Sequence, residues 1–173
     1  MLQIKNLTLS HKKDNRIILS DFSSSFNDGD KAVIIGEEGN GKSTLLKWIY
    51  DKELITAYCE YDGSLVKSGE RLAYLPQELP KEVYDFFMQS DSFLTHNPKT
   101  LCRMAKDFEL PDDFYYSEQS METLSGGEKI KICLMRLLLD EPTVLLLDEP
   151  SNDLDTDTLC LLEDIINNFK HIV

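Results

Sequence analysis

The chain has 173 residues, of which 42% are apolar, and it carries a formal net charge of −13. This length and apolar content indicate one domain with a substantial core, while the acidity argues against broad, nonspecific binding to RNA phosphates. No apolar run reaches the roughly 20 residues that cross a bilayer, and the first residues lack the pattern of a signal peptide, so a cytoplasmic location is expected.

The first 30 residues predict antiparallel strands. Apolar side chains mark residues 4–9, 17–19 and 22–26, and the sequence Asn27-Asp28-Gly29-Asp30 marks a turn.

Residues 31–50 are typical of a strand, a glycine-rich loop and a helix. Lys31–Ile35 is a β-branched apolar run of strand length, and the stretch from Ser43 to Tyr50 places Leu45, Leu46 and Ile49 on one helical face. The loop between them fits the phosphate-loop pattern G-x-x-x-x-G-K-[ST], with the residues Gly36, Glu37, Glu38, Gly39, Asn40, Gly41, Lys42, Ser43 and Thr44.

A loop in this position directs backbone N–H groups and a helix N-terminus at a polyphosphate. Gly36, Gly39 and Gly41 permit positive φ angles and close approach of the backbone. Lys42 is expected to reach the β and γ phosphates, and the Ser43 hydroxyl to ligate Mg²⁺. The sequence therefore predicts a site for ATP with Mg²⁺.

The middle of the chain predicts a short strand and then helices. Residues 72–75 are strand-like and lead to Gln77, and helices are expected over residues 81–89, 98–108 and 129–139. The last helix follows Leu124-Ser125-Gly126-Gly127-Glu128, where Ser125 suits an ordinary N-cap. A serine and two glycines at a helix start also suit a second anion-binding end.

Four apolar residues, Val144–Leu147, predict a strand buried on both faces, and two carboxylates follow it. Ligands of doubly wound sheets lie beyond the carboxyl ends of the strands, which would bring Asp148 beside the phosphate loop. Asp148 is then expected to hold Mg²⁺, and Glu149 to polarise the attacking water. An isolated Asp-Glu pair would instead indicate only a solvated strand end.

These segments together resemble the nucleotide-binding domains of ABC ATPases over nearly the whole chain. One segment is most similar in sequence to the ABC-F branch, which has two fused ATPase domains and acts on ribosomes. This segment is Glu149-Pro150-Ser151-Asn152-Asp153-Leu154-Asp155. The implied fold is α/β: a P-loop NTPase core lobe with a mixed, mostly parallel sheet, an antiparallel β subdomain and an inserted helical lobe. The expected bounds are 1–78 and 141–173 for the core lobe and 79–140 for the helical signature lobe, within a single domain spanning 1–173.

The resemblance also implies roles that the residues alone do not. Gln77 would be a catalytic residue that senses the attacking water and holds Mg²⁺ together with Ser43 and Asp148. Ser125, Gly126, Gly127 and Glu128 would form the signature that covers the γ phosphate of an opposing domain. Asp155 would contact the phosphate loop of that partner. The partner would be a second ABC domain in the same chain or a homodimer mate.

Two features of the family are not evident. A switch histidine is expected roughly 30 residues beyond Glu149, and His171 comes too early for it, so the domain is expected to be truncated before that histidine. No aromatic residue stands where the family stacks on adenine, and His11 is the nearest candidate, with a solvated loop histidine as the alternative.

The predicted function is ATP binding and Mg²⁺-dependent hydrolysis, weak in this chain alone, as part of an ABC-F-like, ribosome-associated or antibiotic-resistance ATPase. The alternative is an ATP-binding subunit of a membrane transporter, with a permease as its partner. A non-hydrolysing regulatory module would require a damaged site, which the motifs do not indicate. The four cysteines show no Cys-x-x-Cys spacing, and Cys133 and Cys160 are expected to be buried, reduced thiols.

Overall fold

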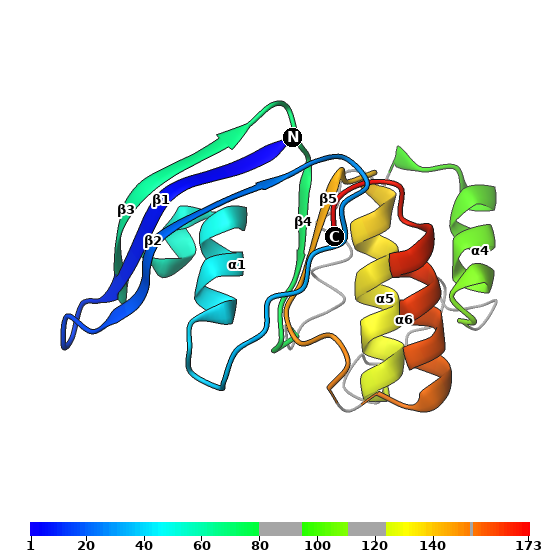
Figure 1. The fold of residues 1–173 in the computed structure, drawn as a ribbon. Coiled ribbons are helices and arrows are strands. Elements are labelled where there is room, and N and C mark those ends of the chain that lie inside the picture. Colours follow the sequence, from blue (N-terminus) through cyan, green and yellow to red (C-terminus); the bar gives the residue numbers. More distant parts are fainter. Residues whose placement is uncertain (80–94, 111–123, 153) are drawn as a thin grey trace. The chain divides into compact units, whose positions relative to one another are not determined.

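The computed structural model describes residues 1–79, 95–110, 124–152 and 154–173, so the helix predicted over residues 81–89 lies outside the described residues. The chain forms two compact units. Unit 1 comprises residues 1–74, 143–148 and 169–173, and unit 2 comprises residues 75–142 and 149–168. Figure 1 labels their helices and strands.

Unit 1 contains a three-stranded antiparallel sheet in the order β2-β1-β3, made of β1 (Leu2–His11), β2 (Ile17–Phe26) and β3 (Cys59–Lys67). The first two strands were predicted, but the third was not. Its glycine, Gly63, has a φ of +124°, and a Cβ there would come within 2.7 Å of the Leu7 Cα on β1. Only glycine therefore fits this close approach of the two backbones.

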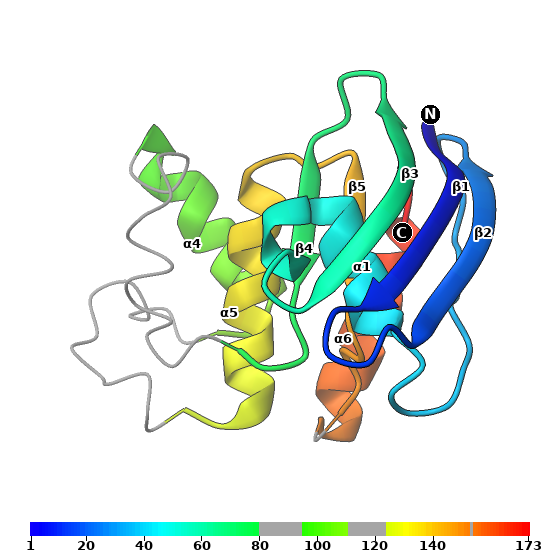
Figure 2. The same cartoon turned by 90° about the vertical axis from the view of Figure 1, so that its left-hand side faces the viewer.

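The inner face of this sheet packs on helix α1 (Lys42–Tyr50), which is followed by the 3₁₀ helix η1 (Lys52–Ile55). Figure 2 shows the sheet curving over α1. Alternate side chains of β1 and one face of α1 make the core of unit 1, which includes Leu2, Ile4, Leu7, Leu9, Leu45, Leu46, Trp48 and Ile49. This packing fixes α1, and thus the end of the loop that precedes it.

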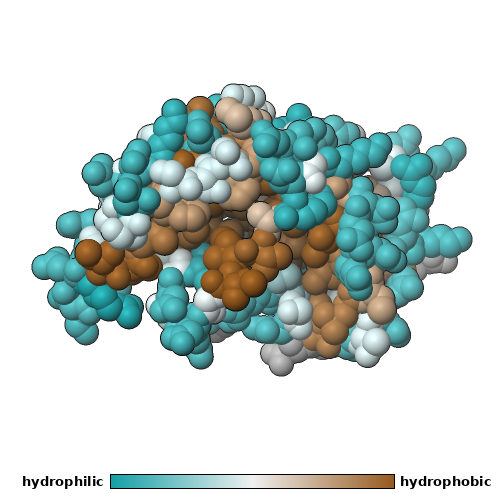
Figure 3. Space-filling view, in the orientation of Figure 1, coloured by the Kyte–Doolittle hydropathy of each residue, from teal (hydrophilic) through white to brown (hydrophobic). Residues whose placement is uncertain are grey.

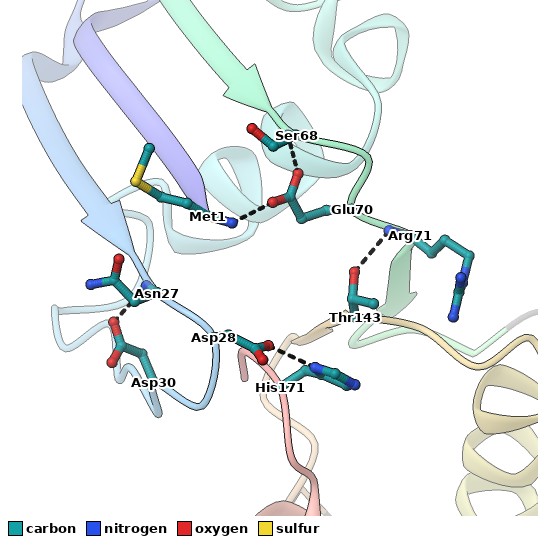
Figure 4. Close-up of polar contacts among 9 residues, drawn as sticks. All are labelled: Met1, Asn27, Asp28, Asp30, Ser68, Glu70, Arg71, Thr143 and His171. Carbon is teal, nitrogen blue, oxygen red and sulfur yellow. Dashed lines mark hydrogen bonds and ion pairs between the residues drawn. The ribbon is translucent and has the colours of Figure 1, made fainter.

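A second sheet in the order β4-β5 is formed by β4 (Leu72–Leu75) and β5 (Val144–Leu147), both as predicted. Thr143 sets their register: it donates its backbone N–H to the Arg71 carbonyl at 2.8 Å, and its Oγ1 accepts the Arg71 N–H at 2.9 Å (Figure 4). Nearby, the His171 ring lies 2.6 Å from an Asp28 carboxylate oxygen. His171 thus joins two loops of unit 1.

The predicted strand over Lys31–Ile35 is wrong: this segment has no regular secondary structure. Its neighbour is Val173, which accepts the Ala32 N–H at 2.8 Å and donates to the Asp30 carbonyl at 3.0 Å. Val33, Ile34 and Ile35 are 82%, 42% and 90% exposed, and an apolar patch is visible beside α1 (Figure 3). Among the described residues no ladder continues past Ala32, and a strand requires one.

Unit 2 contains three described helices, α4 (Pro98–Asp107), α5 (Gly126–Leu139) and α6 (Thr156–Asn168). Helix α5 begins three residues earlier than predicted because Ser125 caps it. Cys133 on α5 is buried as expected, and burial raises the pKa of its thiol to about 12. Cys160 on α6 is exposed, which corrects the prediction of a buried thiol, since Thr158 and Leu162 form the buried side of that helix.

Candidate functional site

The phosphate-loop motif forms an exposed loop that ends at the N-terminus of α1. Gly39 and Gly41 have φ angles of +77° and +82°, whereas Gly36 does not have a positive φ. The positive φ of Gly41 is strained for any L side chain, and a Cβ there would also lie 2.1 Å from the Ile18 Cγ2, so this position favours glycine. Lys42 donates from Nζ to the carbonyl oxygens of Gly36 and Glu37, at 3.0 Å each.

No side chain caps the N-terminus of α1, where Gly41 is the N-cap residue. A helix N-terminus without a capping side chain suits the binding of an anion, which is the role that the sequence predicts for this loop. The other loop residues, Glu38 and Asn40, are exposed, with the Asn40 N–H donating to the Glu37 carbonyl at 3.3 Å. The loop can thus present backbone donors together with the Lys42 ammonium.

The predicted metal ligands Ser43 and Asp148 lie together in unit 1. Ser43 donates from Oγ to Asp148 Oδ1 at 2.9 Å, and the Asp148 side chain is 2% exposed. The second carboxylate oxygen, Oδ2, accepts a hydrogen bond from the Tyr74 hydroxyl at 2.9 Å. Tyr74 is a part of this cluster that the sequence analysis missed.

Two tyrosine hydroxyls line the start of α1. Burial, followed by the bond to Asp148, raises the pKa of Tyr74 far above its ordinary value of 10.0. Burial likewise raises the pKa of Tyr58, whose hydroxyl shares a hydrogen bond with the Thr44 side chain. Both phenols therefore stay protonated and can act as hydrogen-bond donors at neutral pH.

The oxygen set of Ser43 and Asp148 fits Mg²⁺, a hard cation that takes one or two protein oxygens and completes its shell with phosphates and water. Across residues 1–79, 95–110, 124–152 and 154–173 no group of three or more His, Cys, Asp or Glu side chains is arranged to hold a metal. A metal at Ser43 and Asp148 would thus draw most of its ligands from the nucleotide and from solvent.

In unit 2, Glu149 accepts two amide hydrogen bonds on Oε2, from Gln77 at 3.0 Å and from Asn152 at 2.9 Å. Glu149 has a φ of +48°, a left-handed conformation that is uncommon for a non-glycine residue. Such local strain is often found at functional sites. The structure brings the predicted pair Gln77 and Glu149 together, and Asn152 is an addition that the sequence analysis did not assign.

The signature segment forms the start of α5 in unit 2. Ser125 is its N-cap: its Oγ accepts the Glu128 N–H at 3.2 Å, and the Glu128 carboxylate accepts the Ser125 N–H at 2.8 Å. These bonds to Ser125 lower the pKa of Glu128. The start of α5 is therefore a capping box, in which the Glu128 carboxylate binds the Ser125 N–H.

Asp155 caps the next helix. Its Oδ1 accepts the Thr158 N–H at 2.8 Å, and that bond is the main cause of its lowered pKa. A Cβ on Gly127 would lie 3.0 Å from the other Asp155 oxygen and 2.8 Å from the Thr158 hydroxyl, so Gly127 permits the starts of α5 and α6 to approach closely. Asp155 and the signature therefore lie side by side in unit 2.

The sequence of this chain is similar to those of known proteins. Residues 19–152 match the family model for ABC transporters. The chain is 35% identical over 164 residues to the ATP-binding protein Uup of Caulobacter vibrioides, covering 89% of this chain and 26% of that protein. It is 32% identical over 206 residues to the energy-dependent translational throttle protein EttA of Haemophilus influenzae, covering 91% of this chain and 35% of that protein.

A solved structure, a putative ABC transporter ATP-binding protein from Pyrococcus furiosus, has a TM-score of 0.74 and 22% identity, covering 99% of this chain and 88% of that one. The expected α/β fold class is confirmed. The chain belongs to the ABC transporter family and is an ATP-binding domain of the ABC type. Its likeness to the ABC-F branch, which includes Uup and EttA, is also confirmed.

The chain spans 26% to 35% of the length of these two relatives. Among the described residues, no helix is both long and apolar enough to span a membrane.

Proposed function

We propose that this chain binds Mg²⁺-ATP in unit 1 and hydrolyses it when a second ABC domain completes the site. The observation that carries the proposal is the contact between Ser43 and Asp148, 105 residues apart in sequence and joined at 2.9 Å beside the phosphate loop. In this proposal Lys42 binds the β and γ phosphates, and Ser43 and Asp148 hold Mg²⁺, which screens phosphate charge when bound.

Glu149 is the proposed catalytic residue. Its carboxylate accepts a proton from the attacking water, with Gln77 and Asn152 holding the carboxylate in place through their amide groups. Gln77 is also proposed as a ligand of Mg²⁺. The glycines and Asn40 of the phosphate loop, together with Glu37, Glu38 and Thr44, are proposed to surround the phosphates.

The signature residues Ser125, Gly126, Gly127 and Glu128 are proposed to cover the γ phosphate held by the partner domain, with Asp155 contacting the partner's phosphate loop. We propose that residues 1–173 form one ABC domain of two lobes. The core lobe comprises residues 1–78 and 141–173, and the helical lobe comprises residues 79–140. The proposed partner is either a second ABC domain of the same protein or another copy of this chain. The proposed location of the protein is the cytoplasm.

A mixing experiment tests the composite site. Lys42→Ala removes the phosphate-loop cation, and Ser125→Arg blocks the signature; each variant alone should be inactive. A mixed pair contains one intact site, so the two variants together should release phosphate at a rate that rises with the square of protein concentration. The control mixes Lys42→Ala with the Lys42→Ala/Ser125→Arg double variant, which restores no site. Activity in the control equal to that of the first mixture would contradict the composite site.

For the whole protein we propose an ABC-F-like ATPase that acts on ribosomes, supported by the wording of residues 149–155 and by the relative named as a translational throttle protein. The alternative, a transporter subunit with a permease partner, is supported by the family description. Sedimentation of the longer protein with ribosomes in the presence of ATP, against co-fractionation with membranes, separates the two.

A further inference from the structure

Tyr74 has a contact that the proposed function does not use. Its side chain lies on β4 and is 8% exposed, and its hydroxyl donates to Asp148 Oδ2 at 2.9 Å. The register of β4 and β5, fixed by the bonds between Arg71 and Thr143 (Figure 4), brings this hydroxyl to the carboxylate that follows β5. The Tyr50 ring packs on the Tyr74 ring with centroids 5.5 Å apart.

The buried Asp148 carboxylate needs donors on both oxygens. Burying a charge is costly unless hydrogen bonds replace water, and here Ser43 serves one oxygen and Tyr74 the other. The torsion that turns a carboxylate is broad and soft. A carboxylate held at one oxygen only can therefore rotate, whereas one held at both cannot.

The orientation of Asp148 also decides how Ser43 is presented. A serine hydroxyl has one hydrogen and two lone pairs. Because that hydrogen is used by Asp148, the lone pairs of the Ser43 oxygen remain available to a cation. If Asp148 turned, the Ser43 hydroxyl would lose its acceptor and could rotate.

We propose that Tyr74 is a positioning residue for Mg²⁺: its hydroxyl fixes Asp148, and through Asp148 the Ser43 oxygen, in the orientation that receives the metal with the ATP phosphates. This inference rests on the proposed function of Ser43 and Asp148. Partners that orient metal ligands typically contribute about 10- to 100-fold to metal affinity.

The test is the metal enhancement of ATP binding, the ratio of the dissociation constant for ATP in EDTA to that in excess Mg²⁺, measured by calorimetry. Tyr74→Phe should lower this ratio about tenfold while leaving affinity in EDTA within about twofold of the parent. The matched control is Tyr50→Phe, which removes a neighbouring hydroxyl from a ring that is 40% exposed and should leave the ratio unchanged.

A purely structural role for Tyr74 would lower the melting temperature and both affinities together, and that outcome overturns the inference. So does an unchanged ratio in Tyr74→Phe when the parent shows metal enhancement. A parent chain that binds no ATP would instead overturn the proposed function on which the inference rests.

If Tyr74→Phe fails to fold, two substitutions of nearly equal volume decide the matter. 4-Aminophenylalanine at position 74 keeps a donor at the para position, whereas 4-methylphenylalanine fills the same space without one. We expect metal enhancement to be retained with the first and reduced about tenfold with the second. Equal ratios for the two would overturn the inference.

Discussion

The proposed metal-binding cluster and the proposed water-handling cluster differ in how they are built. In unit 1, Asp148 is buried and each of its oxygens accepts a hydroxyl hydrogen bond. In unit 2, Glu149 is partly accessible, has a left-handed backbone conformation and is held by two amide groups. The two carboxylates therefore differ in burial and in the type of group that donates to them: hydroxyls for Asp148 and amides for Glu149.

The sharpest way to separate the two clusters is Glu149→Gln. The neutral amide cannot accept the proton of the attacking water, so turnover should fall about 1000-fold while the dissociation constant for Mg²⁺-ATP stays within about threefold. Phosphate release and calorimetry measure the two quantities. The control is Glu141→Gln, which changes an exposed glutamate of unit 2 with a similar φ of +46° and should alter neither. Loss of ATP affinity in Glu149→Gln would contradict the proposal that Glu149 acts in hydrolysis and not in binding.

Lys42→Ala tests the proposed binding of ATP by the phosphate loop. It removes the ammonium that now bonds the Gly36 and Glu37 carbonyls and that is expected to transfer to the phosphates. Charge-assisted bonds of this kind are strong, so ATP affinity should fall about 100-fold by calorimetry. Lys47→Ala, on the last turn of the same helix, provides the comparison and should leave affinity unchanged. Equal affinities for all three proteins would contradict the assignment of the phosphate loop.

Much of the fold and of the site could be predicted because it is coded locally. The strand Val144–Leu147, the capping serine Ser125 and the phosphate-loop motif each depend on residues that are neighbours in sequence. Strand β3 could not be predicted, because charged residues and Gly63 interrupt its alternation and only pairing with β1 makes it a strand. The contact of Tyr74 with Asp148 was also hidden, since it depends on which strands are neighbours.

Two apolar segments also show that a strand cannot be predicted from its own residues alone. Strands were predicted at both Lys31–Ile35 and Val144–Leu147. Among the described residues only the second pairs on both sides, with β4 on one side and Ile172 on the other. Apolar residues favour burial, but they form a strand only where a neighbouring backbone supplies the ladder.

This contrast predicts a large loss of stability for a substitution in the second segment and almost none for one in the first. Leu145→Ala removes a side chain with no exposed surface and should lower the free energy of unfolding by about 3 kcal/mol. Ile35→Ala acts on a side chain that is 90% exposed and should change that energy by less than about 0.5 kcal/mol. Urea unfolding at pH 7 measures both. A loss of more than about 2 kcal/mol in Ile35→Ala would show that residues 31–35 are packed in solution.

The smallest expected effect concerns Glu128, the carboxylate at the start of α5. Its pKa in the folded chain is lowered from the ordinary value of 4.5 by its bonds to Ser125. A lowered folded pKa contributes stability that is fully present above pH 4.5 and is lost as the pH falls through the folded value. Glu128→Gln keeps an acceptor oxygen but removes the charge beside the helix N-terminus. We therefore expect it to cost about 0.5 kcal/mol at pH 7 and less at pH 3, by urea unfolding. Glu163→Gln, an exposed substitution on α6, should show no such difference between the two pH values. A cost for Glu128→Gln that is equal at both would mean that the charge of Glu128 does not stabilise α5.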